Sequence, residues 1–148
     1  MFRNSFTDAE WQTVLFTPLW AFHGVAAVDR KIDNKESAAL AKELSEALLF
    51  RDELAREVLT ALGMDLRAIM QAFAADSRTI VDGLLQAAGI LDAKLPPGAA
   101  DGLKRAVLLI ALNVAKAAGP MFGDKMSNEE KAAIVLIAAA LRVPVPTG

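Results

Sequence analysis

The sequence of 148 residues contains no cysteine, no tyrosine and a single histidine. The absence of thiols excludes disulfide bonds, thiolate metal centres and cysteine nucleophiles. With one histidine, few side chains can exchange protons near neutral pH, so few residues are available as a general acid or base in catalysis. These absences favour a non-enzymatic protein.

An excess of positive charge is also missing. The chain has 16 lysine and arginine residues and 18 aspartate and glutamate residues, which gives a formal net charge of -2. A general nucleic-acid binder, or a protein held on an anionic membrane by charge, needs a basic surface. We therefore expect no nucleic-acid partner.

Long hydrophobic runs are missing as well, although 54% of the residues are hydrophobic. The most apolar runs, residues 106–114 and 132–141, fall well short of the roughly 20 residues that cross a bilayer. Carboxylates lie close behind the N-terminus, where a signal peptide would have a continuous apolar stretch. We expect a cytoplasmic protein without a membrane span.

What the sequence does contain is a set of helix start and stop signals. Thr7 and Glu10 have the spacing of a capping box, which predicts a helix from residue 8 to about residue 28. Pro18 lies inside this range and lacks a backbone N–H group. We therefore expect a kink or break at residues 16–18.

Further caps, breakers and apolar faces predict the remaining helices. The expected ranges are 33–48, 51–62, 65–75, 76–88, 103–118 and 127–141, and residues 95–98 form the expected linker. Since no run alternates with a period of two, the predicted class is all-α, in one domain covering residues 1–148. The two C-terminal helices are the most apolar and are expected at the centre. The last is expected to be largely buried, because residues 134–137 are all apolar.

An internal repeat links the two ends of the chain. Residues 32–40 and residues 126–134 share the order apolar, cap, Asn, any residue, Glu, any residue, Ala, Ala, apolar. Each copy also follows an alanine-rich helix end. The repeat predicts a pseudo-duplicated helix–turn–helix unit, with copies at residues 7–48 and 103–141.

The first copy resembles a known family. Residues 25–36 read Val-Ala-Ala-Val-Asp-Arg-Lys-Ile-Asp-Asn-Lys-Glu, which is similar to the Ala-x-x-Asp-Gly-x-Ile-(Ser/Asp)-x-x-Glu signature of TerB-like tellurite-resistance domains. Residues 123–130 look like its degenerate partner. The resemblance implies an all-α bundle of about seven helices. It also implies a link to tellurite and other stress responses, without an established catalytic activity.

Acidic residues in both turns are the candidate metal ligands. The resemblance implies a Ca²⁺ or Mg²⁺ site, with Asp29, Asp33 and Glu36 in the first turn and Asp124 and Glu130 in a weaker second one. Carboxylate oxygens in a turn suit these hard cations. Arg30 stands where the family has glycine and adds a positive charge. The alternative interpretation is that Asp33 and Glu36 cap a helix.

The first helix carries the other candidate residues. His23 could be a ligand, a base or a pH sensor, and its alternative interpretation is a packed side chain. The aromatic residues could line a ligand pocket or belong to the core; they are Trp11, Phe16, Trp20 and Phe22. The charged cluster at residues 51–57 is interpreted as a solvated helix face.

Two functions follow as hypotheses. The first is a non-enzymatic, TerB-like interaction module with protein partners, which acts through the end of the bundle that carries the acidic turns. The second is a small-ligand binder or hydrolase built around the aromatic first helix. Homo-oligomer formation is compatible with either hypothesis.

Overall fold

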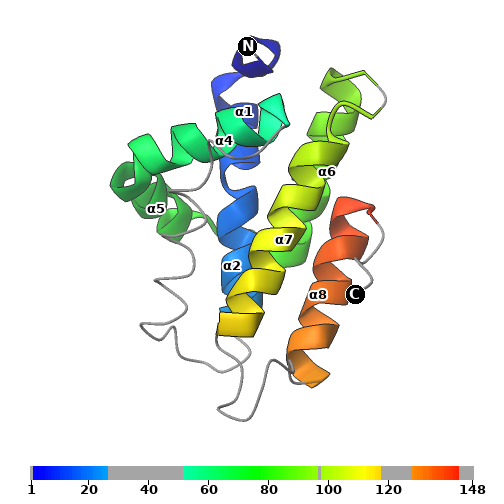
Figure 1. Cartoon of the computed structure of the whole chain (residues 1–148). Coiled ribbons are helices and arrows are strands. Elements are labelled where there is room, and N and C mark those ends of the chain that lie inside the picture. Colours follow the sequence, from blue (N-terminus) through cyan, green and yellow to red (C-terminus); the bar gives the residue numbers. More distant parts are fainter. Residues whose placement is uncertain (1, 27–51, 97, 118–127, 144–148) are drawn as a thin grey trace.

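The computed structural model of the chain describes residues 2–26, 52–96, 98–117 and 128–143 (Figure 1). Every regular element in these ranges is helical, and they contain no strand. The predicted all-α class is therefore confirmed, as a single bundle of helices. The predicted helix at 33–48 lies outside the described residues, and with it part of the repeat.

A short 3-10 helix at Phe2–Ser5 precedes the bundle. The α-helices are α1 (Asp8–Leu15), α2 (Thr17–Ala26), α4 (Glu53–Met64), α5 (Leu66–Ala75), α6 (Ile80–Lys94), α7 (Asp101–Ala117) and α8 (Asn128–Leu141). If α1 and α2 are taken as one kinked helix, the described ranges hold six helices. Figure 1 shows α2, α6, α7 and α8 side by side, with α4 and α5 at one side.

The capping box and the kink in the first helix are both confirmed. The backbone N–H of Glu10 donates to Thr7 Oγ1 over 3.1 Å, and the backbone N–H of Thr7 donates to Glu10 Oε1 over 2.9 Å. The helix breaks at Phe16, two residues before Pro18. This position fits the missing backbone donor of proline.

Two predicted helix ends are wrong. The predicted ranges 51–62 and 76–88 end directly before Gly63 and Gly89, which were expected to break the helix, but both glycines lie inside α4 and α6. A Cβ atom added at either one would have no heavy atom within 4 Å. Both glycines therefore lie in open space within a helix, where the weak preference of glycine against helix is outweighed by the rest of the segment.

The start of α6 also differs from its prediction. Thr79, not Asp76, caps the helix, because its hydroxyl accepts a hydrogen bond from the backbone N–H of Asp82 over 3.1 Å. Asp76 pairs instead with the Arg78 guanidinium. The predicted start of α7 is two residues late, since the helix begins at Asp101.

The prediction that both C-terminal helices are central holds for α7 but not for α8. The helix α7 packs against α2, α4 and α8. On α8, Ile134 and Ile137 are 2% exposed, whereas Val135 is 53% and Leu136 is 57% exposed. Four consecutive residues cover more than one full turn of a helix, so they cannot all face the bundle. The expectation that α8 is largely buried is therefore wrong.

Gly83 sets the distance between α6 and α2. A Cβ atom at this position would lie 2.4 Å from the indole ring of Trp20. Glycine is thus required for the close approach of the two helices. This approach brings the first turns of α6 next to the end of α2.

Candidate functional site

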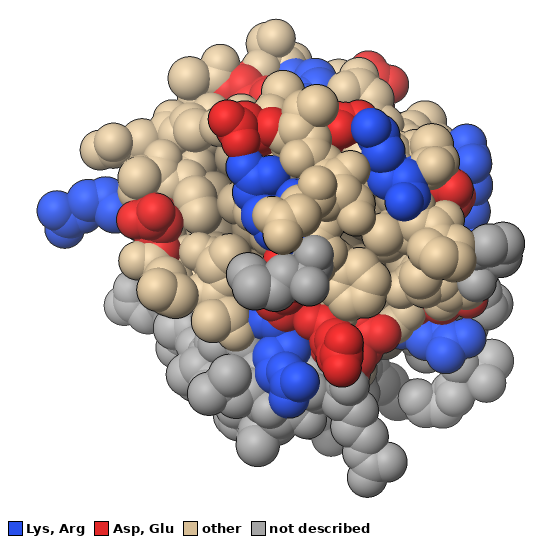
Figure 2. All heavy atoms as spheres, turned by 90° about the horizontal axis from the view of Figure 1, so that it is seen from above, with Lys and Arg blue, Asp and Glu red and all other residues tan. Residues whose placement is uncertain are grey.

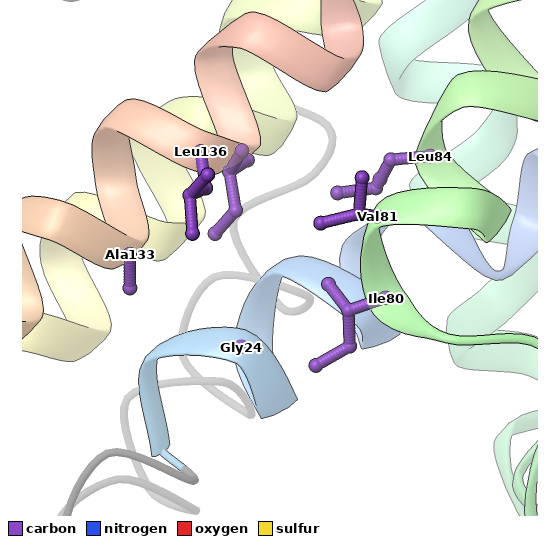
Figure 3. A pocket seen from close by; sticks show the side chains of 7 residues that line it. Gly24, Ile80, Val81, Leu84, Ala133 and Leu136 are labelled. Atoms are coloured by element: carbon purple, nitrogen blue, oxygen red, sulfur yellow. The ribbon is translucent and has the colours of Figure 1, made fainter.

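An apolar pocket of about 170 Å³ opens between α2, α6 and α8. Among the described residues, no charged or polar side chain lines it; the lining residues are Gly24, Ile80, Val81, Leu84, Ala133, Leu136 and Ile137. Figure 3 shows Ile80 and Val81 reaching from α6 toward α8, with Ala133 and Leu136 on the opposite side and Gly24 at the floor. We call this feature the α6–α8 groove.

The floor of the groove depends on a glycine. A Cβ atom added at Gly24 would lie 3.4 Å from Ile137 Cδ1 and 3.5 Å from Ile80 Cγ2, which is ordinary van der Waals contact. Any side chain at this position would therefore occupy the pocket. Ile137 and Leu84 are buried and anchor the two walls to the core.

The rim of the groove carries exposed apolar side chains. They are Val81 (38% exposed) and Leu85 (41%) on α6, and Leu136 (57%) on α8. Val135 is 53% exposed as well, but it lies two positions from Ala133 and therefore faces away from the groove. Residues 81 and 85 are four apart and therefore share one face of their helix. Together Val81, Leu85 and Leu136 form what we call the apolar strip. Clustered apolar surface of this kind marks interaction sites in proteins that are otherwise polar outside.

The exposed charges at the starts of α6 and α8 lie outside the groove, which neither of them lines. Asp82 is exposed in the first turn of α6, next to Val81. Lys131 is exposed near the start of α8, four residues before Val135. Figure 1 shows α6 and α8 side by side and running in the same direction. The two charges therefore lie at the same end of the helix pair. Each is two positions from a groove-lining residue, Ile80 or Ala133, and so lies about 160° away around its helix.

Arg78 joins the start of α6 to the first helix and is part of the scaffold. Its guanidinium pairs with Asp76 over 2.7 Å and lies 4.9 Å above the Trp20 ring. It also donates to Thr13 Oγ1 over 3.0 Å and to Gln86 Oε1 over 2.9 Å. Hydrogen bonds from Arg78 hold the pKa of Asp76 below its ordinary value. This ion pair therefore stabilises the wall of the groove formed by α6.

A second ion pair connects α6 with α7. The Lys104 side chain is 4% exposed, and its Nζ donates to Asp92 Oδ1 over 2.8 Å. Elsewhere the charges are dispersed: on the described part of the face drawn in Figure 2, lysine and arginine are interspersed with aspartate and glutamate. That face shows no broad basic patch.

The predicted solvated face at residues 51–57 has more specific roles. Asp52 caps α4 by accepting a hydrogen bond from the Ala55 backbone N–H over 2.8 Å. The Glu57 carboxylate accepts from the backbone N–H groups of Phe2 (2.9 Å) and Arg3 (2.8 Å). Sequence spacing could not indicate this contact, because its partners are more than 50 residues apart.

His23 is a packed side chain, as its alternative interpretation held. Its ring stacks on Phe73 with centroids 5.2 Å apart and meets Phe22 edge-on. Burial lowers the pKa of His23 below its ordinary value. The imidazole therefore favours its neutral form in the folded protein.

The aromatic residues of the first helix form part of the core. They are all buried, with exposures of 8% for Trp11, 0% for Phe16, 2% for Trp20 and 2% for Phe22. The interpretation as core residues is confirmed. The α6–α8 groove, by contrast, has an aliphatic lining.

The structure does not describe the side chains of the predicted metal ligands. Asp29, Asp33, Glu36 and Asp124 lie outside the described residues, and so does the side chain of Glu130. Within the described ranges, no three Asp, Glu or His side chains gather closely enough to hold a metal ion. Metal binding at the acidic turns stays a prediction.

The sequence contained only an indirect signal for the groove. The run of apolar residues 134–137 exceeds what one helix face can bury, and one of them, the exposed Leu136, lines the groove. Val81 and Leu85 carried no such signal, because an apolar pair four residues apart within the predicted helix 76–88 is equally typical of a buried helix face. Gly24 becomes informative only once α2, α6 and α8 are placed together.

Comparison of the chain with protein-family models, with curated proteins and with solved structures found no match. No single helix in the described ranges is long and apolar enough to cross a membrane. By length and composition alone, α4 and α5 would pass as a pair, but they are bent by 91°.

Proposed function

We propose that this chain is a non-enzymatic interaction module that binds a protein partner in the α6–α8 groove. The observation that carries the proposal is the apolar strip, whose three large side chains are between 38% and 57% exposed around an apolar pocket. Such surface is unfavourable in water, and burial by a partner stabilises a complex by about 25 cal/mol per Å² of apolar area.

The dimensions of the groove favour a helix as the bound element. Two neighbouring helices with apolar residues at their rims can accept an amphipathic helix along their length. The pocket of about 170 Å³ is close in size to the engineered cavity of about 150 Å³ that holds one benzene ring. One leucine or phenylalanine side chain of the partner would serve as the anchor.

The family resemblance supports the same class of function. TerB-like domains are linked to tellurite and stress responses, and the proposal places this chain in such a role, in the cytoplasm. Binding of Ca²⁺ or Mg²⁺ at the acidic turns is the second part of the proposal. The alternative of a small-ligand binder is a hypothesis with the aliphatic groove as its candidate pocket, in place of the expected aromatic one. A hydrolase finds no nucleophile or base there, because the described residues that line the groove are all apolar.

Selection of displayed helical peptides against the folded protein tests the proposal. We expect amphipathic helices with a large apolar anchor to be selected. Leu136→Ser and Val81→Ser should each weaken their binding about tenfold or more, which corresponds to about 1.4 kcal/mol. Leu109→Ser is the matched control, because Leu109 is 44% exposed but lies on α7 and does not line the groove.

Two results would count against the proposal. One is a set of selected peptides that bind the Leu136→Ser and Leu109→Ser variants with equal affinity, since the groove would then not be the site. The other is a selection that yields no helical peptide while single-ring apolar compounds bind the pocket. That result would favour the small-ligand alternative.

A further inference from the structure

We infer that the rings of Phe16, Trp20 and His23, which we call the aromatic cage, form a binding site for a small molecule with one aromatic ring. The ligand enters when α5 moves away from the bundle. In the structure the cage is closed, and the Phe73 side chain of α5 fills it. The inference is independent of the proposed function, because none of the three cage residues lines the α6–α8 groove.

The plug itself shows which chemistry the cage accepts. The Phe73 ring centroid lies 5.2 Å from that of Phe16, 6.0 Å from that of Trp20 and 5.2 Å from that of His23. Phe16 and Trp20 meet the Phe73 ring edge-on, whereas His23 stacks on it with an interplanar angle of 25°. These are the geometries that aromatic pairs prefer. A free molecule with a ring of the same size can make the same three contacts.

The cage is held in place by the bundle and not by α5. Trp20 lies against Gly83 of α6, and the Arg78 guanidinium lies 4.9 Å above its ring. Phe16 is fully buried and meets Trp20 edge-on, with centroids 5.5 Å apart. None of these contacts involves a residue of α5. The walls of the cage therefore stay in place when Phe73 leaves.

The helix that carries the plug is weakly anchored. None of the ten residues of α5 is buried, whereas every other described α-helix has buried side chains. Its N-cap residue, Asp65, makes no side-chain hydrogen bond to the first turn. Figure 1 shows α5 at the edge of the bundle, beside α4. A helix of this length is marginal by itself, and segments with few buried contacts open at a lower free energy than the whole protein unfolds.

The chain on both sides of α5 is fixed, so the movement is confined to residues 65–75. Arg78 follows the helix and donates hydrogen bonds to Thr13 Oγ1 over 3.0 Å and to Gln86 Oε1 over 2.9 Å. Before α5, the buried Leu59 and Leu62 hold α4 on the bundle. Phe73 can therefore leave the cage without unfolding its neighbours. A ligand that takes its place makes this minor open conformation the dominant one.

Titration of the full chain with phenol tests the inference. We expect phenol to shift the indole N–H signal of Trp20 in NMR spectra. At saturation, hydrogen exchange of the backbone amides of residues 66–75 should be about tenfold faster or more, while exchange in α7 stays unchanged. Cyclohexanol has a similar size and the same hydroxyl group but no aromatic ring, so it should bind about tenfold more weakly.

Two variants of α5 separate the plug from its helix. Phe73→Ala removes the competing ring, so the affinity for phenol should rise about tenfold or more. Met70→Ala is the matched control, because Met70 is 37% exposed on the same helix and contributes no ring to the cage. It should leave the affinity for phenol unchanged. If Phe73→Ala does not fold, the exchange measurement on the wild type decides the test.

Three results would overturn the inference. The first is a wild-type chain that binds no phenol at millimolar concentrations, and the second is equal affinity for phenol and cyclohexanol. The third is phenol binding that leaves the exchange of α5 unchanged, since the ligand would then lie elsewhere, as in the α6–α8 groove. None of these results touches the proposed function, which depends on the loss of peptide binding in Leu136→Ser.

Discussion

Glycine residues at two positions of α6 have opposite surroundings, although they are only six residues apart. Gly83 lies against the Trp20 indole, where a Cβ atom would come within 2.4 Å, whereas Gly89 has open space around it. Gly83→Ala should lower the free energy of unfolding by about 1–3 kcal/mol, because it overpacks the crossing of α6 with α2. Urea denaturation measures the change.

Gly89→Ala is the matched control for this prediction. Alanine favours a helix over glycine by roughly 0.5–1 kcal/mol, so this variant should be more stable than the wild type. Equal effects of the two substitutions would show that α6 does not approach Trp20 as closely as the structure has it.

His23 should make the stability depend on pH. Its pKa in the folded protein is lowered by burial, so the unfolded chain, with an ordinary pKa of about 6.5, binds the proton more readily. The stability conferred by neutral His23 is full above about pH 6.5 and falls as the pH drops below it. The free energy of unfolding between pH 7.5 and pH 5, measured by denaturant titration, should decline less in His23→Gln than in the wild type. Since the chain has one histidine, parallel curves would contradict this prediction.

Asp29 is the residue at which the metal prediction can be tested most cleanly. Unlike Asp33 and Glu36, it has no expected role as a helix cap, so Asp29→Asn removes charge alone. If Ca²⁺ or Mg²⁺ binds the folded chain, a hundredfold excess over the dissociation constant should stabilise it by about 2.7 kcal/mol. Thermal unfolding with millimolar metal should show a rise in Tm for the wild type and a smaller one for Asp29→Asn. No shift in either protein would reject metal binding at this turn.

Among the helices, α8 has two different sides. Ile137 is 2% exposed and faces the core, whereas Val135 is 53% exposed and faces solvent. Ile137→Asp buries an unpaired charge, which costs several kcal/mol against a typical total stability of about 5–15 kcal/mol. We expect this variant not to fold stably, while Val135→Asp should unfold cooperatively by circular dichroism, close to the wild type. A stable Ile137→Asp protein would contradict the placement of α8.

Local signals predicted the helices more reliably than their ends. The capping box at Thr7 and the break near Pro18 act through neighbouring backbone groups, so the sequence shows them directly. Glycine was misleading at positions 63 and 89, because the helix continues where the rest of the segment favours it. A helix end depends on the balance over the segment and not on one residue.

The groove is a property of the bundle as a whole, and this is why the sequence could not predict it. Its three helices come from both ends and the middle of the chain, and it exists because Gly83 lets α6 approach α2 while α8 packs beside them. Hydrophobic periodicity and helix caps were enough to predict the all-α class. Prediction of the candidate site would have required the relative positions of α2, α6 and α8, which depend on contacts far apart in the sequence.

The central claim is that the α6–α8 groove is the interaction surface of this chain. Methyl NMR spectra of the protein, recorded while a selected helical peptide is added, test it most directly. The claim predicts that the methyl signals of Val81, Leu84, Leu136 and Ile137 shift together as the peptide saturates. If these four signals stay in place while that of Leu109 moves, partners bind elsewhere and the claim is wrong.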